Sequence, residues 1–133
     1  MDRKYKILII DDEEDLRENL KYILEKQGYD VFVSMDGQEG LQTAKAEKPD
    51  LIILDILMPG LNGTEVIKKL KLEPLLRDIP VFFLTGLVSR ADEALGLSGI
   101  NVEDHQYRVI AKPFEQEKLL KTIKSVLSST KNK

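Results

Sequence analysis

The stretch Leu51-Ile52-Ile53-Leu54-Asp55-Ile56-Leu57-Met58-Pro59-Gly60 carries the strongest structural signal in the chain. Its four leading apolar residues are typical of a short strand that is buried on both faces, and a carboxylate follows directly. The same pattern occurs earlier, where Asp11 and Asp12 follow the apolar run Ile7-Leu8-Ile9-Ile10. Two buried strands that both end in carboxylates predict an open parallel sheet with a ligand site at the carboxyl ends of its strands.

The remaining sequence alternates between strand-like and helix-like segments. Strand-like apolar runs occur at residues 6–10, 30–34, 51–54, 80–84 and 107–110, and segments with helical spacing lie between them. This alternation predicts an α/β fold, a flavodoxin-like doubly wound (βα)5 domain whose five-stranded parallel sheet has the order 2-1-3-4-5. In that order the first and third strands are neighbours, which would bring Asp11, Asp12 and Asp55 together.

Several helix boundaries can also be predicted. Gly28 is expected to end the first helix in a left-handed conformation, and Asp36 to cap the second. A third helix is expected after the turn Gly60-Leu61-Asn62-Gly63, and a last helix with Leu119, Ile123 and Leu127 on one face. Between them, residues 88–106 are expected to form a long connection with a short helix at Ser89–Leu97.

Length and composition restrict the class of protein. The 133 residues, 42% hydrophobic and 32% charged, predict one globular domain at 1–128 followed by a polar tail at 129–133. A net charge of −3 argues against binding to nucleic acid or an anionic membrane. The chain has no cysteine, and it has no apolar run near the ~18 residues that a membrane helix needs, so we expect a cytoplasmic protein.

The three carboxylates suggest a metal site. Acidic residues at strand ends often only cap helices or stay solvated, which is an even alternative for Asp11 or Asp12 considered alone. Three together repel one another unless a cation is present, and carboxylate oxygens are the ligands of hard divalent ions. We therefore expect Mg²⁺.

Two more residues are expected at the same edge of the sheet. Thr85 follows the run Val81-Phe82-Phe83-Leu84, and Lys112 follows Val109-Ile110-Ala111 in a Lys-Pro-Phe sequence. With Asp11, Asp12 and Asp55 in this order, the chain resembles the receiver domain of bacterial response regulators over essentially its whole length. The five residues together are far more specific than any one of them.

The resemblance implies a role for each residue. Asp55 would be the phosphoacceptor, Asp12 a direct Mg²⁺ ligand and Asp11 a ligand mainly through water, with the backbone carbonyl of Leu57 completing the protein ligands. Mg²⁺ would offset the repulsion between the Asp55 carboxylate and a phosphoryl group. Lys112 would add a second positive charge, and its bond to Pro113 is usually cis in this family.

Thr85 would hydrogen-bond a phosphoryl oxygen and so differ in position between the two states. The implied partners are a sensor histidine kinase or a histidine phosphotransfer protein, and a target that binds the face of helix 4, strand 5 and helix 5. A homodimer is possible, and no direct contact with nucleic acid or membrane is expected. Because the chain ends after its last helix, it resembles the single-domain regulators of chemotaxis and of the sporulation relay.

Some positions depart from the family pattern. Val109 stands where receivers often have an aromatic residue, and Tyr107, two residues earlier, could replace that residue only in part. An alternative is therefore a receiver-like interaction module that works without phosphorylation. Leu57 and Leu87 flank the expected approach of a hydrolytic water, so we also expect slow loss of the phosphoryl group.

Two enzyme or cofactor classes fit less well. A phosphatase of the haloacid dehalogenase type needs a second Asp at position 57, where this chain has Leu57. An FMN-binding flavodoxin needs a loop after the first strand that accepts phosphate, but Asp11-Asp12-Glu13-Glu14 would repel phosphate.

Overall fold

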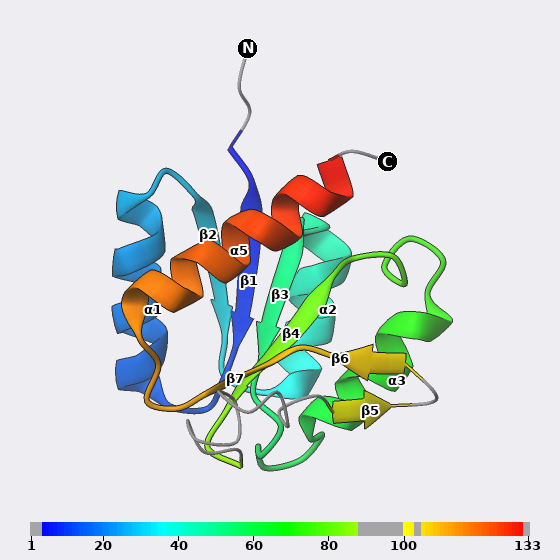
Figure 1. The fold of residues 1–133 in the computed structure, drawn as a ribbon. Helices are drawn as coiled ribbons and strands as arrows, with labels where there is room; N and C mark the ends of the chain where they lie inside the picture. The colour runs from blue at the N-terminus through cyan, green and yellow to red at the C-terminus, as the bar shows by residue number, and fades with distance from the viewer. Residues whose placement is uncertain (1–3, 88–99, 103–104, 132–133) are drawn as a thin grey trace.

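The computed structural model describes residues 4–87, 100–102 and 105–131, with side chains through residue 129. Figure 1 shows the elements in chain order. They are β1 (Lys6–Ile10), α1 (Glu14–Lys26), β2 (Asp30–Ser34), α2 (Gly37–Glu47), β3 (Leu51–Leu54), α3 (Gly63–Leu72), β4 (Val81–Thr85), β5 (Ile100–Val102), β6 (His105–Tyr107), β7 (Val109–Ala111) and α5 (Gln116–Lys131).

Five strands form one parallel sheet in the order β2-β1-β3-β4-β7. With β7 as the fifth parallel strand, this is the predicted order 2-1-3-4-5. In the register of the sheet, Ile10 is opposite both Ser34 and Leu54, so β1, β2 and β3 end level with one another. The residues that follow β1 and β3 therefore leave the sheet at the same height.

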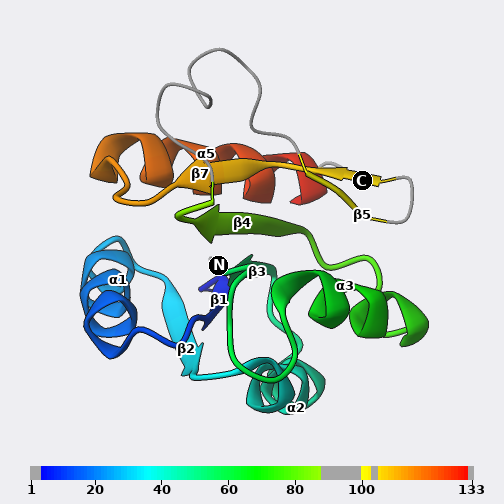
Figure 2. The ribbon, with the colours of Figure 1, turned by 90° about the horizontal axis from the view of Figure 1, so that it is seen from below.

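Helices cover both faces of the sheet (Figure 2), with α1 and α5 on one face and α2 and α3 on the other. Alternate residues of each strand supply the two cores: Ile7 and Ile9 pack with the α1 and α5 side, and Leu8 and Ile10 with the α2 and α3 side. All four are at most 1% exposed. Burial on both faces explains why the strands are continuous apolar runs rather than alternating ones.

The predicted helix ends are confirmed. The Asp36 side chain accepts a hydrogen bond from the amide of Glu39 at the start of α2, at 2.8 Å. Gly28 has φ +93° after α1, a conformation that costs glycine least. The α3 helix begins with a capping box, in which Asn62 and Glu65 each accept from the other's backbone amide.

The prediction was wrong about the segment before the last strand. The fifth parallel strand is β7, at Val109–Ala111, and not residues 107–110. Instead of a connection without strands, β5 and β6 form an antiparallel hairpin in which Ile100 is opposite Tyr107.

The short helix expected at Ser89–Leu97, which would be helix 4, lies outside the described residues. The α5 helix continues to Lys131, into the segment expected to be a tail.

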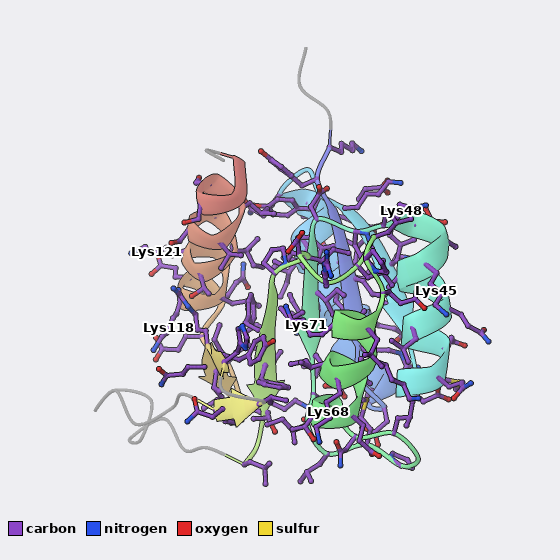
Figure 3. The ribbon with its side chains drawn as sticks, turned by 90° about the vertical axis from the view of Figure 1, so that its right-hand side faces the viewer. Lys45, Lys48, Lys68, Lys71, Lys118 and Lys121 are labelled. Carbon is purple, nitrogen blue, oxygen red and sulfur yellow. The ribbon has the colours of Figure 1, made fainter. Side chains whose placement is uncertain are left out.

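The hairpin packs on the same face of the sheet as α2 and α3, because its residues Val102 and Tyr107 belong to that core. Figure 3 shows the lysines on the outer surfaces of the helices, among them Lys68 on α3 and Lys121 on α5. Among the described residues, no helix combines the length and the apolar character needed to cross a membrane.

Candidate functional site

Four of the predicted site residues meet at the carboxyl edge of the sheet, the lower edge in Figure 1. Asp11 follows β1, Asp55 follows β3, Thr85 ends β4 and Lys112 follows β7. Backbone hydrogen bonds continue the sheet beyond the strands: the amide of Asp55 donates to the carbonyl of Ile10 at 3.0 Å, and that of Lys112 to Thr85 at 3.0 Å. Their side chains thus start from a rigid frame.

Asp11, Asp12 and Asp55 form the predicted acidic cluster. One carboxylate oxygen from each lies within 4.8 Å of the others. Asp11 and Asp55 are only 3% and 6% exposed, whereas Asp12 is exposed. The donor set is made of hard oxygen atoms that carry negative charge, which fits Mg²⁺ or another hard divalent cation.

Lys112 joins this cluster. Its Nζ lies 2.8 Å from Oδ2 of Asp11, 3.1 Å from Oδ2 of Asp55 and 2.6 Å from Oε1 of Glu13. Burial alone would lower the pKa of Lys112, but hydrogen bonds to Asp11 and Glu13 outweigh it and raise that pKa above its ordinary value. The ammonium is therefore charged throughout the physiological range. The Lys112–Pro113 bond is cis, as the resemblance implies.

Two residues that support Asp11 were not predicted. Arg17 donates from Nη1 to the backbone carbonyl of Asp11 at 2.8 Å, and the amide of Glu13 donates to Asp11 Oδ1 at 2.9 Å. Burial nevertheless raises the pKa of Asp11, with Lys112 and Glu13 only partly offsetting it. An Arg one turn into α1 has no sequence signature of its own, so this contact could not have been predicted.

The raised pKa of Asp11 makes a testable statement about stability. A group whose pKa is raised on folding adds stability below its unfolded pKa and loses that contribution as the pH rises through the folded pKa. Without divalent cations, the stability of Asp11→Asn relative to the parent should therefore increase as the pH rises above about 4, the ordinary pKa of an aspartate. Urea unfolding at a series of pH values measures this, with the exposed Asp30→Asn as control. A relative stability that falls with pH would contradict it.

Backbone amides complete the site. The amide of Leu57 lies 3.4 Å from Asp55 Oδ1, and the amide of Leu87 donates to Thr85 Oγ1 at 3.3 Å. Thr85 is fully buried, whereas the side chains of Leu57 and Leu87 are exposed. Their predicted role in shielding the acidic cluster stays a prediction.

Gly63 is a further residue with a role that the sequence did not reveal. A Cβ atom there would lie 2.5 Å from the carbonyl oxygen of Asp55 and 2.8 Å from Cα of Ile56. Both are backbone atoms, which cannot move aside as a side chain could. The glycine therefore lets α3 begin directly against the loop that follows β3, where the amide of Gly63 donates to the carbonyl of Ile56.

The structure thus places three carboxylates, a threonine and a lysine at the carboxyl edge of a doubly wound sheet, which is the arrangement that the resemblance to receiver domains implies.

Comparison with known proteins agrees with the resemblance to receiver domains. The family described as response regulator receiver domain matches residues 7–124. A curated relative, the alkaline phosphatase synthesis transcriptional regulatory protein PhoP of Bacillus subtilis, is 40% identical over 92% of this chain and 48% of that protein. The chain spans about half the length of the curated relatives it matches.

Solved structures give the same result. The signal receiver domain of a signal transduction histidine kinase from Syntrophus aciditrophicus is 36% identical, with a TM-score of 0.79 over 97% of this chain and 94% of that one. The chemotaxis protein CheY4 of Vibrio cholerae is 30% identical, with a TM-score of 0.78 over 93% of this chain and 99% of that one. The chain belongs to the response regulator receiver domain family of two-component signalling.

Proposed function

We propose that this chain is a cytoplasmic signalling switch that accepts a phosphoryl group on Asp55 in the presence of Mg²⁺. The donor would be the phosphohistidine of a sensor kinase or of a histidine phosphotransfer protein. The observation that carries the proposal is the Lys112 Nζ held 3.1 Å from Asp55 Oδ2, beside an acidic cluster that fits a divalent cation. Both positive charges needed to bring a phosphoryl group to a carboxylate have a place here.

In the proposed reaction, an Asp55 oxygen forms a bond to phosphorus while the bond from phosphorus to the donor nitrogen breaks. Asp11, Asp12, Asp55 and the carbonyl of Leu57 would hold the metal, which supplies positive charge against the repulsion of two anions. Lys112 would contact a phosphoryl oxygen, and the Thr85 hydroxyl would donate to another. Thr85 Oγ1 accepts from the amide of Leu87, which leaves the hydroxyl proton free to be donated to the phosphoryl oxygen.

Incubation with acetyl phosphate followed by intact-mass measurement tests the proposal. We expect a single phosphoryl adduct with Mg²⁺ and none with excess EDTA. Failure to form an adduct, both here and with phosphohistidine donors, would contradict the proposal.

Lys112→Met should slow adduct formation about a hundredfold, the usual cost of removing one preorganised donor to a developing charge. Lys121→Met is the matched control, because Lys121 is an exposed lysine of α5. The rate is measured by intact mass at saturating Mg²⁺. Equal rates for both variants would show that Lys112 does not contact the phosphoryl group.

Leu57→Asn or Leu87→Glu should shorten the lifetime of the phosphorylated form. Both side chains are exposed beside the site and neither can orient a water molecule, whereas an amide or carboxylate can, which should raise the hydrolysis rate roughly tenfold or more. Decay of the adduct is followed after the donor is removed. Leu75→Asn, which changes another exposed leucine, is the control. A parent that loses its adduct as fast as these variants would refute the shielding role.

The output would be a protein target or onward transfer of the phosphoryl group, through the face of helix 4, strand 5 and helix 5, with β7 as that strand; a homodimer could use the same face. We place the domain at 1–128.

A second candidate is an interaction module independent of phosphorylation, favoured by the buried Val109 and by the hairpin before β7. Target binding that is unchanged in Asp55→Asn would select it.

A further inference from the structure

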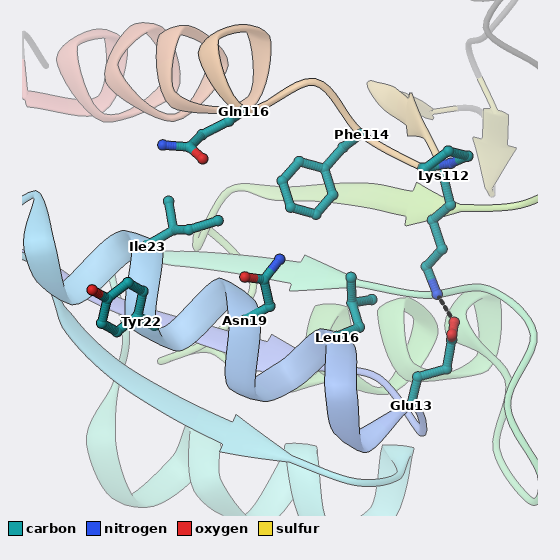
Figure 4. A pocket seen from close by; sticks show the side chains of 9 residues that line it. Glu13, Leu16, Asn19, Tyr22, Ile23, Lys112, Phe114 and Gln116 are labelled. Atoms are coloured by element: carbon teal, nitrogen blue, oxygen red, sulfur yellow. Dashed lines mark hydrogen bonds and ion pairs between the residues drawn. The ribbon is translucent and has the colours of Figure 1, made fainter.

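Glu13 has an unexpected position for its residue type. It is the N-cap residue of α1, a position where Ser, Thr, Asp and Asn are preferred, and its side chain makes no capping hydrogen bond. The side chain reaches instead to Lys112, with Oε1 2.6 Å from Nζ. Figure 4 shows this ion pair at one end of an open cavity of about 760 Å³ between α1 and α5.

The Lys112 ammonium is thus shared between two kinds of partner. Asp11 and Asp55, on one side, are buried and belong to the acidic cluster. Glu13, on the other, is 60% exposed at its side chain and lies outside that cluster. In the proposed function this ammonium would compete with a metal ion for Oδ2 of Asp11 and would contact the phosphoryl group.

We propose that Glu13 is a positioning residue that acts as an alternative counter-ion for Lys112. It thereby raises the affinity of the site for a divalent cation and lowers its affinity for an anion. The inference rests on the proposed function. Lys112 Nζ contacts all three carboxylates in this structure, and Glu13 is the one that would remain its counter-ion if the ammonium moved away from the oxygens of Asp11 and Asp55. In this proposal Glu13 would contact neither the metal nor the phosphoryl group, and would act only through Lys112 and its own charge.

The first consequence concerns the cation. Without the Glu13 carboxylate, Lys112 is left with Asp11 and Asp55 alone and competes more strongly for the oxygens that a divalent cation needs. Loss of a nearby negative charge also weakens attraction for a cation. Both effects lower Mg²⁺ affinity.

The second consequence concerns the anion, whose affinity for the site changes in the opposite direction. At saturating Mg²⁺ an arriving anion must draw Lys112 away from Glu13, and the Glu13 carboxylate repels that anion. Removing the carboxylate frees the ammonium and removes the repulsion. Affinity for an anion beside Asp55 therefore rises.

The test is to titrate Mg²⁺ alone, and then fluoroberyllate at saturating Mg²⁺, by calorimetry. For Glu13→Gln we expect Mg²⁺ affinity to fall and fluoroberyllate affinity to rise, each about two- to fivefold, the range of a partly exposed ion pair. Glu14→Gln, the same change in an exposed neighbour that makes no ion pair with Lys112, should alter each affinity by less than half as much.

Two further variants separate positioning from helix stability. Glu13→Asn supplies a preferred N-cap, so α1 should be at least as stable while both affinity changes remain. In the Lys112→Met background, Glu13→Gln should raise fluoroberyllate affinity less than it does with Lys112 present, because only the repulsion between the Glu13 carboxylate and the anion is then removed. The inference would be overturned if Glu13→Gln changed the affinities for Mg²⁺ and fluoroberyllate in the same direction. It would also be overturned if Glu13→Gln and Glu14→Gln had equal affinities.

Failure of the proposed function gives a different result. A parent protein that binds no fluoroberyllate and forms no adduct would refute phosphoryl acceptance at Asp55. The Mg²⁺ titration would still decide on Glu13, because a weaker affinity in Glu13→Gln than in Glu14→Gln supports competition by Lys112, and equal affinities refute it.

Discussion

Asp55→Asn is expected to form no phosphoryl adduct, with a yield at least about a hundredfold below that of the parent, because an amide oxygen is a poor nucleophile. The substitution keeps the size of a side chain that is only 6% exposed, and the amide oxygen it introduces can still face Lys112. Intact-mass measurement with acetyl phosphate and Mg²⁺ gives the yield.

Asp30→Asn is the matched control for that experiment. It removes the same charge, but Asp30 is an exposed residue at the beginning of β2, the end of the sheet opposite to the site. It should form adduct at the parental rate. Equal labelling of Asp55→Asn and the parent would remove Asp55 from the reaction.

Phe83→Ala should lower the free energy of unfolding by about 3–5 kcal/mol, the usual cost of truncating a buried phenylalanine. Phe83 is fully buried on the α2 and α3 face, and its ring meets Tyr107 edge-on, with centroids 5.9 Å apart at 73°. The truncation leaves a cavity where β4 supports the hairpin. Urea unfolding measures the change.

Tyr22→Ala is the comparison for Phe83→Ala. Tyr22 is an aromatic residue of α1 that is 62% exposed, so its loss should change stability by no more than about 0.5 kcal/mol. A cost below about 1 kcal/mol for Phe83→Ala would mean that the core around the hairpin is not packed as described.

The sheet and the acidic cluster could be predicted because the signals are local and mutually consistent. A four-residue apolar run such as Leu51–Leu54 is too short for a helix and too apolar for an exposed strand, which leaves a buried parallel strand. Once strand order is fixed by right-handed connections, the residues after β1 and β3 must meet. The meeting of Asp11, Asp12 and Asp55 could therefore be predicted from the strand order alone.

The hairpin could not be predicted in this way. Its strands have three residues each, too few for a two-residue period to be recognised, and Ile100, Val102 and Tyr107 are separated by polar residues. Tertiary contacts hold the hairpin in place: Tyr107 packs on Phe83, and Nζ of Lys71 on α3 lies 5.9 Å from the centre of the Tyr107 ring. Contacts between distant segments leave no local pattern.

The expectation for Tyr107 is modified accordingly. It shares the α2 and α3 core with Val109, but it belongs to β6 and not to the parallel sheet. Phe83, two residues before Thr85 on the same strand, is the residue through which Tyr107 reaches β4. The contact of Glu13 could not be predicted because Lys112 lies 99 residues away in the chain. That of Gly63 depends on how closely the backbone after β3 approaches the start of α3, which the residue types do not reveal.

Chemical localisation of the phosphoryl group is the most direct test of the central claim. Borohydride reduces an aspartyl phosphate to homoserine, so peptide mapping after labelling with acetyl phosphate and Mg²⁺ identifies the residue. We predict homoserine at position 55 and unmodified Asp11 and Asp12. Homoserine at position 11 or 12, or an adduct that borohydride does not convert, would contradict the assignment of Asp55 as the phosphoacceptor.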